Sequence, residues 1–196
     1  TLRTSSAASD VYKRQFPRGE LRDYLELISK SEVKIAVKPQ YVDKLPKLWD
    51  GEVRGLLQRV DDRGRLEEFA EITSIEHILE RKLSGLSGGE LQRVAICATI
   101  LKEADVYFFD EPSSYLDIHE RMRVVSIIQS LVEDGKRIIV IEHDLAILDV
   151  LCDLVHIVYG QRAAYGIFTP PRTTRTAINA YLDGYLNEEN VRIRDK

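Results

Sequence analysis

Hydrophobic and polar residues alternate with two different periods along the first half of the chain. Leu21–Ile28 carries apolar residues at helical spacing and predicts a short helix, whereas Val33–Val37 alternates with a period of two and predicts a strand. Pro39 ends the strand pattern and starts a loop, because proline cannot donate a backbone hydrogen bond to a sheet. Asp50–Ile78 has the spacing of short helices and is broken at Asp61–Gly64. The first half therefore predicts one strand followed by a helical region.

Longer helices and strands alternate through the second half of the chain. A long helix follows Glu90, with apolar residues three or four positions apart. The β-branched run Ile138–Ile141 predicts a central parallel strand that is buried on both faces. Gly135 lies where the C-terminal cap of the preceding helix belongs. The apolar positions of the long helix are Leu91, Val94, Ala95, Ala98 and Leu101. The remaining predicted strands are Val106–Phe109 and Leu154–Tyr159, and the remaining predicted helices are Glu120–Glu133 and Leu145–Leu151. Met122, Val125 and Leu131 lie on or near one face of the helix Glu120–Glu133.

This order of elements predicts an α/β domain with a parallel sheet. The polar motifs follow the C-terminal ends of the predicted strands, which is where ligands bind in open α/β sheets. We therefore expect the chemistry of the protein to lie at that edge of the sheet.

Composition narrows the class of protein without naming an activity. The 196 residues include 44% hydrophobic and 31% charged residues, which is typical of a globular domain with a core, and the net charge is −4. This charge argues against a broad nucleic-acid-binding face, although a local basic patch stays possible. Cys97 and Cys152 lack metal-ligand spacing and are interpreted as reduced thiols. No apolar run approaches the length of a membrane span and no signal peptide is visible, so we expect a cytoplasmic protein.

Thr1–Gln15 differs in composition from the rest of the chain. It is rich in Ser, Ala and Thr, shows no clear period, and resembles the adapter-derived ends of translated environmental reads. We interpret it as a non-native segment, or alternatively as a disordered tail, and leave it out of the fold.

Two adjacent carboxylates, Asp110 and Glu111, end the predicted strand Val106–Phe109 and precede Pro112. Neighbouring side chains on a strand diverge, so the two carboxylates can take separate roles. Phosphoryl transfer needs one group in the shell of Mg²⁺ and another that orients the attacking water. Asp110 suits the metal and Glu111 the general base, but a turn-rich strand end would produce the same residues.

Three further motifs are ordinary when each is taken alone. Ser87, with Glu90 three residues later, has the pattern of a capping box at a helix start. Gly88 and Gly89 leave backbone N–H groups open to an anion at that helix N-terminus. A capped helix without a ligand fits equally well. His143, which follows a predicted strand between Glu142 and Asp144, could contact a phosphate or be purely structural, and so could Gln40.

The order and spacing of these motifs resemble the ABC ATPase family across residues 16–196. Gln40 matches the Q-loop, Leu86–Gln92 the signature motif, Asp110 and Glu111 the end of Walker B, Asp117 the D-loop, and His143 the switch histidine. The resemblance implies an ABC nucleotide-binding domain, a RecA-like parallel sheet with an α-helical subdomain at about 41–100. It also implies that Glu111, Gln40 and His143 are catalytic, that Asp110 and Gln40 hold Mg²⁺, and that Ser87, Gly88, Gly89, Glu90 and Asp117 meet an ATP held by a partner domain.

Several segments are similar to one branch of this family, the ribosome-recycling ABC ATPases or RNase L inhibitors. They are Lys38–Asp43, Asp110–Asp117, Tyr159–Gly166, Leu182–Leu186 and Glu189–Arg194. The sequences of these motifs resemble those of the archaeal members. The resemblance implies a cytoplasmic protein with an iron–sulfur cluster domain, two ABC domains and a hinge, which splits ribosomes into subunits with a release factor. It implies a partial ABC domain at 16–168, an extension and hinge start at 169–196, and partners that comprise the second ABC domain, ribosomal subunits and rRNA, with no membrane.

One motif of the family is missing from the sequence. No Gly-x-x-x-x-Gly-Lys-Ser/Thr P-loop, which cradles the phosphates of ATP, occurs in the chain. We therefore expect an N-terminally truncated domain that hydrolyses no ATP by itself and exposes a sheet edge and an apolar face. The iron–sulfur clusters would belong to an upstream domain. The alternatives are the ATPase subunit of an ABC importer and a non-catalytic ABC scaffold.

Overall fold

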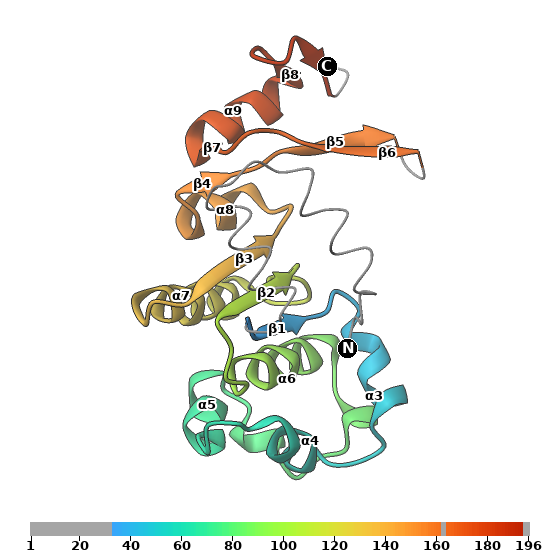
Figure 1. Ribbon diagram of the computed structural model, residues 1–196. Coiled ribbons are helices and arrows are strands. Elements are labelled where there is room, and N and C mark those ends of the chain that lie inside the picture. The colour runs from blue at the N-terminus through green and yellow to red at the C-terminus, as the bar shows by residue number, and fades with distance from the viewer. Residues whose placement is uncertain (1–32, 162–163, 194–196) are drawn as a thin grey trace, which may run out of the picture.

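The computed structural model describes residues 33–161 and 164–193 (Figure 1). The predicted helix Leu21–Ile28 and the interpreted segment Thr1–Gln15 lie outside the described residues.

The central sheet has three parallel strands. They are β1 (Ile35–Lys38), β2 (Val106–Asp110) and β3 (Arg137–Ile141), in the order β1-β2-β3. Ala36 pairs with Tyr107, and Tyr107 pairs with Ile138, so these three side chains point to the same face. The prediction of an α/β fold with a parallel sheet is confirmed.

One face of the sheet packs on the main hydrophobic core. Ala36, Tyr107 and Phe109 lie on that face and join buried side chains of α6 (Gly88–Ile100) and α7 (Ile118–Glu133) in one cluster. The apolar stripe predicted for the long helix is buried in this cluster, apart from the half-buried Ala98. Burial of these side chains supplies the main stabilisation of the fold.

The opposite face of the sheet is open over its outer strands. Ile35 and Val37 of β1 are 52% and 50% exposed, and Ile139 and Ile141 of β3 are 50% and 48% exposed. The prediction of a central strand buried on both faces is therefore wrong for β3, which lies at the edge of the described sheet. A β-branched run indicates a strand, but it does not reveal which face a helix will cover. An exposed apolar face was expected from the sequence.

A helical region lies between β1 and α6, below the sheet in Figure 1. Its predicted break at Asp61–Gly64 is confirmed, because the Asp61 carboxylate accepts the N–H groups of Arg63, Arg65 and Leu66 and starts the next helix. Gly64 takes a positive φ of 65° in this turn. The helical elements are η1 (Val42–Lys44), α3 (Leu45–Leu48), α4 (Val53–Val60), α5 (Leu66–Ile72), η2 (Glu76–Ile78) and η3 (Leu83–Gly85).

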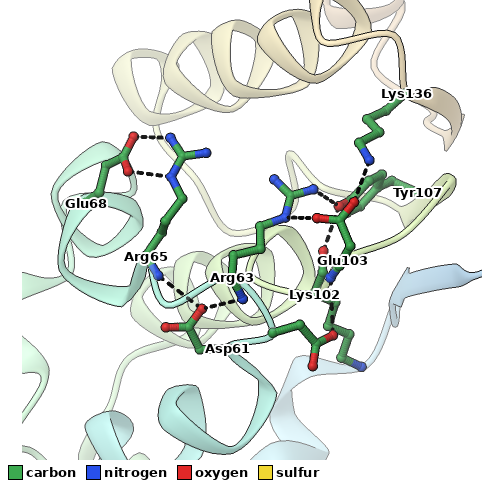
Figure 2. A network of polar contacts seen from close by, with 9 residues as sticks. Asp61, Arg63, Arg65, Glu68, Lys102, Glu103, Tyr107 and Lys136 are labelled. Atoms are coloured by element: carbon green, nitrogen blue, oxygen red, sulfur yellow. Dashed lines mark hydrogen bonds and ion pairs between the residues drawn. The ribbon is translucent and has the colours of Figure 1, made fainter.

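A polar network ties this helical region to the start of the sheet (Figure 2). Arg63 donates to the Tyr107 hydroxyl at 2.6 Å, and that hydroxyl donates to the carbonyl of Lys102 at 2.6 Å. Arg63 also pairs with Glu103 at 2.9 Å, and Lys136 pairs with the same carboxylate at 2.7 Å. The network lies at the N-terminal ends of β2 and β3, and it leaves their C-terminal ends available for the site.

Helix α7 begins at Ile118, two residues before the predicted start, because the Asp117 carboxylate caps it. Val125 and Leu131 are buried as predicted, but Met122 is 41% exposed and does not belong to the buried face. Gly135 has a φ of 77° and donates its N–H to the carbonyl of Val132, which confirms the helix end.

The C-terminal elements build a second, smaller core around Ile157, Ala177 and Leu186. The predicted strand Leu154–Tyr159 is interrupted at His156 and Ile157, because Thr169 takes hydrogen bonds from both residues. Among the described residues, no helix has the length and apolar character needed to cross a bilayer. The elements are α8 (Leu145–Leu151), β4 (Leu154–Val155), β5 (Val158–Gln161), β6 (Tyr165–Phe168), β7 (Arg172–Thr173), α9 (Thr174–Asp183), β8 (Tyr185–Leu186) and β9 (Val191–Arg192).

Candidate functional site

The C-terminal ends of the three parallel strands bring three predicted site residues together. Gln40 follows β1, Glu111 follows β2, and His143 follows β3. Gln40 Nε2 donates to Glu111 Oε1 at 3.0 Å, and His143 Nδ1 lies 3.8 Å from the same oxygen. Ser114 Oγ donates to Glu111 Oε2 at 3.2 Å. We call these four side chains the Glu111 cluster.

The backbone of Glu111 has an unusual conformation. Its φ of 47° lies in the left-handed region, which non-glycine residues adopt mainly where neighbouring contacts hold them. The Glu111 side chain is 28% exposed, so its carboxylate is open to a ligand while both oxygens keep hydrogen-bond partners. Such a carboxylate can accept a proton from a bound water.

Asp110 ends β2 and lies half-buried beside Glu111. Burial raises the pKa of its carboxyl group, the Glu111 charge raises this pKa further, and the Lys38 ammonium opposes both effects. A cation bound at Asp110 would stabilise the ionised form of this carboxyl group. The amide oxygen of Gln40 is available as a second ligand when its nitrogen donates to Glu111. Among the residues with a described structure, no group of three or more His, Cys, Asp or Glu side chains could hold a metal.

The Glu142 carboxylate fixes the loop that carries His143. It accepts the backbone N–H groups of His143 at 3.1 Å and Asp144 at 3.4 Å, and the N–H of Ser113 at 2.9 Å. It therefore joins the loop after β3 to the loop after β2. The His143 side chain is 73% exposed and can reach a ligand above Glu111.

The second predicted group of residues lies at the start of α6. Ser87 accepts the N–H of Glu90 at 3.3 Å, and the Glu90 carboxylate accepts the N–H of Ser87 at 2.7 Å, so the predicted capping box is present. Arg81 pairs with Glu90 at 2.8 Å. We call Ser87–Glu90 the signature loop. Its hydrogen bonds are local, and none in the described part of the chain reaches a side chain of the Glu111 cluster.

The signature loop packs against the residues that precede α7. A Cβ atom added at Gly88 would lie 3.2 Å from the Tyr115 ring, and one added at Gly89 would lie 3.0 Å from the Tyr115 carbonyl. Close approach of the two segments therefore favours glycine at both positions. Asp117 accepts the N–H of Glu120 at 2.9 Å as the cap of α7, and this bond lowers the pKa of its carboxyl group. The interface role predicted for Asp117 stays a prediction.

Three residues at the site were missed in the sequence. Lys38 is fully buried and donates to the carbonyls of Asp110 and Glu111. Gln92 of α6 donates to the carbonyls of Glu111 and Pro112, both at 2.8 Å. Glu142 was noted only as a neighbour of His143. The available signals were a lysine in an alternating strand and a glutamine on the apolar stripe of a helix.

Comparison with known proteins places the chain in a family. A family profile described as "ABC transporter" matches residues 12–114. An uncharacterised ABC transporter ATP-binding protein of Methanocaldococcus jannaschii is 49% identical over 185 residues, which cover 94% of this chain and 30% of that protein. The chain thus spans about a third of the length of the relatives that it matches.

Solved structures agree with these matches. A structure of an archaeal ribosomal stalk protein, aP1, in complex with the archaeal ribosome recycling factor aABCE1 has a TM-score of 0.90 and 49% identity. It covers 97% of this chain and 37% of the solved chain. A structure named RNase-L inhibitor has a TM-score of 0.89 and 50% identity, with the same coverage of both chains. The chain belongs to the ABC ATPase family, and within it matches the ABCE1 or RNase L inhibitor branch over most of its length.

Proposed function

We propose that the chain is part of a longer parent protein that hydrolyses ATP, and that the Glu111 cluster is the hydrolytic half of one ATP site. The convergence of Gln40 and His143 on one carboxylate carries the proposal. Glu111 acts as the general base for the attacking water. Gln40 and His143 orient that water and the terminal phosphate.

Asp110 and the amide oxygen of Gln40 would serve the Mg²⁺ that accompanies ATP. Mg²⁺ keeps several waters and binds through one or two protein oxygens plus phosphate oxygens, which fits so small a protein donor set. When bound, the ion neutralises charge that develops on the phosphates. Asp110 and Gln40 would hold the ion, and Glu111 would take the proton from water.

The signature loop would serve a different ATP, which is held by a second ABC domain. Gly88 and Gly89 present backbone N–H groups at the N-terminus of α6, where an anion is favoured, and Ser87, whose own N–H is bonded to Glu90, lies at the same helix end. Glu90 holds the loop through the capping box, and Asp117 caps α7 just after Tyr115, whose ring and carbonyl approach the loop. The Glu111 cluster and the signature loop would then face two separate nucleotides.

The parent protein is proposed to split ribosomes into subunits in the cytoplasm, with a release factor. The likeness to a solved archaeal ribosome recycling factor supports this activity. Residues 16–168 would form the partial ABC domain with its helical subdomain at about 41–100. Residues 169–196 would begin the hinge to the second ABC domain, and rRNA would be a contact. The iron–sulfur clusters would lie in a separate domain.

The 196-residue polypeptide is proposed to hydrolyse no ATP by itself, because its sequence contains no P-loop to hold the phosphates. Mg²⁺-dependent turnover by this polypeptide that Glu111→Gln abolishes would contradict this.

The proposed function is tested in the parent protein with purified ribosomes. ATP-dependent subunit splitting, followed by sedimentation, should be lost in Glu111→Gln and retained in the control Glu133→Gln, which changes an exposed carboxylate at the end of α7. If the Glu111→Gln protein splits ribosomes over repeated cycles at the rate of the unsubstituted protein, the proposal is contradicted.

A further inference from the structure

The backbone at Glu111 needs an external support. Its left-handed φ of 47° is unfavourable for a residue that has a Cβ atom. Such a conformation persists where the surroundings fix the two peptide groups on either side, because φ and ψ are the rotations between them. The hydrogen bonds of those two peptide groups therefore help to fix the direction in which the Glu111 side chain leaves the backbone.

The peptide group that precedes Glu111 is fixed at both ends. The carbonyl of Asp110 accepts a hydrogen bond from Lys38 Nζ at 2.7 Å. The N–H of Glu111 donates to the carbonyl of Ile141 on β3 at 2.8 Å. Strands on both sides of β2 thus hold this peptide group.

The peptide group that follows Glu111 leads to Pro112 and has no N–H. Its carbonyl is therefore its only hydrogen-bonding group. It accepts from Lys38 Nζ at 3.1 Å, from Gln92 Nε2 of α6 at 2.8 Å and, at a longer 3.4 Å, from the backbone N–H of Ser114. The same ammonium group thus contacts both peptide groups around Glu111.

We propose that Lys38, supported by Gln92, is a positioning residue for Glu111: its ammonium group bridges the two flanking peptide groups and sets the backbone twist that aims the carboxylate into the Glu111 cluster. The inference rests on the proposed role of Glu111 in ATP hydrolysis. An ammonium group carries three donors, so it can serve two carbonyls at once. A methionine fills a similar volume and donates nothing.

Burial of the Lys38 ammonium group carries a desolvation cost, which its hydrogen bonds to the two carbonyls offset. Lys38 is 0% exposed, on the same face of β1 as the apolar Ala36. An uncharged side chain would pack at this position without the desolvation cost of a buried ammonium. Lys38 also lies two residues before Gln40, so one strand end supplies both the support of the Glu111 backbone and a donor to its carboxylate.

The test measures ATP turnover by the parent protein. Lys38→Met should lower kcat about tenfold or more and change KM for ATP less than about threefold, because the loss concerns the chemical step rather than nucleotide binding. The matched control is Lys34→Met, which removes an exposed lysine just before β1 and should leave both constants unchanged. An unchanged kcat in Lys38→Met would overturn the inference.

A double-mutant cycle separates positioning from a general structural effect. If Lys38 acts through Glu111, Lys38→Met should change the residual single-turnover rate less than about twofold in a Glu111→Gln background. Equal losses in both backgrounds would show that Lys38 supports the fold alone, and would overturn the inference.

Thermal melting of each variant shows whether it folds. If Lys38→Met does not fold, Gln92→Leu, which removes another side-chain donor to the Glu111 carbonyl, is tested in both backgrounds by the same criteria. A parent protein without ATP turnover before any substitution overturns the proposed function and this inference with it. Turnover in the parent with an additive cycle overturns the inference alone.

Discussion

The Glu111 cluster and the signature loop are built in opposite ways. The Glu111 cluster is held by one hydrogen bond between residues 71 positions apart, Gln40 and Glu111, besides the local bond from Ser114 to Glu111. Hydrogen bonds of the signature loop join Ser87 and Glu90, which are three positions apart. The first region depends on the neighbouring strands of the sheet, whereas the second is a helix cap built within one short segment.

This difference fits two different tasks. A general base needs a fixed direction, and long-range contacts from three strands supply it. A phosphate-binding loop that meets a nucleotide on another domain needs open backbone donors, and the cap uses the N–H groups of Ser87 and Glu90 but not those of Gly88 and Gly89. Gln92 links the two regions, because it lies on the helix that the signature loop starts and donates to the Glu111 carbonyl.

The largest expected effect concerns the exposed histidine of the Glu111 cluster. We expect His143→Ala to lower ATP turnover of the parent protein about a hundredfold, because general acid–base and orienting groups contribute on that scale. ATP binding should persist, since the ring contacts Glu111 and not the core. The control is His119→Ala, an exposed histidine in the first turn of α7. Equal turnover in the two variants would remove His143 from the site.

A smaller effect is expected where the signature loop meets the segment before α7. Gly89→Ala places a methyl group 3.0 Å from the Tyr115 carbonyl, so one of the two segments must shift. We expect a loss of about 1–2 kcal/mol of stability, as for other overpacked sites. Gly85→Ala is the matched control, because no atom lies within 4 Å of its added carbon. Denaturant unfolding of both variants measures the difference, and equal midpoints would show that the approach is loose.

Loss of the helix cap should cost less than this. Ser87→Ala removes the side-chain oxygen that accepts the Glu90 N–H, and we expect a loss of about 1 kcal/mol. Ser126→Ala, on the exposed side of α7, should change stability by less than about 0.5 kcal/mol. If the Ser87 variant unfolds at the unsubstituted midpoint, the capping box does not stabilise the signature loop.

The smallest expected effect concerns the reactivity of the buried Cys97 thiol on α6. Both cysteines are free, and burial raises the pKa of Cys97 to about 12. We expect no alkylation of Cys97 in the folded parent at pH 8 or pH 9, measured by mass spectrometry of its peptide. Burial also raises the pKa of the half-buried Cys152, which should react slowly. Rapid labelling of Cys97 would show that α6 opens readily.

The raised pKa of Cys97 makes the stability of the folded protein depend on pH. The unfolded thiol ionises near its ordinary pKa of 9.0, whereas the folded thiol stays protonated up to about 12. Stability is therefore fully present below pH 9 and falls as the pH rises towards 12, since the unfolded state loses its proton first. Cys97→Ser should reduce this alkaline loss in a pH series of unfolding midpoints.

Local patterns predicted much of the fold and the positions of the site residues. The capping box at Ser87, the break at Asp61–Gly64 and the strand ends at Glu111 and His143 all depend on neighbouring residues, so the sequence could indicate them. The resemblance to the ABC ATPases then implied that Gln40, Glu111 and His143 would serve one ATP.

Other features depend on distant packing and could not be predicted. The exposure of Ile139 and Ile141 reflects which face of the sheet a helix covers. Met122 shares the helical spacing of buried residues but lies at the margin of the packed stripe. The interruption before β5 depends on Thr169, more than ten residues further along the chain. Lys38 was missed because its partners are backbone carbonyls 72 and 73 positions away.

The most direct test of the account asks whether the two regions serve different ATP molecules. The parent protein with Glu111→Gln is loaded with radiolabelled ATP and chased with unlabelled nucleotide. The account predicts that it retains unhydrolysed ATP, and that adding Ser87→Arg does not release this ATP, because the signature loop faces another nucleotide. Release of the retained ATP by Ser87→Arg would contradict the assignment of the Glu111 cluster and the signature loop to separate sites.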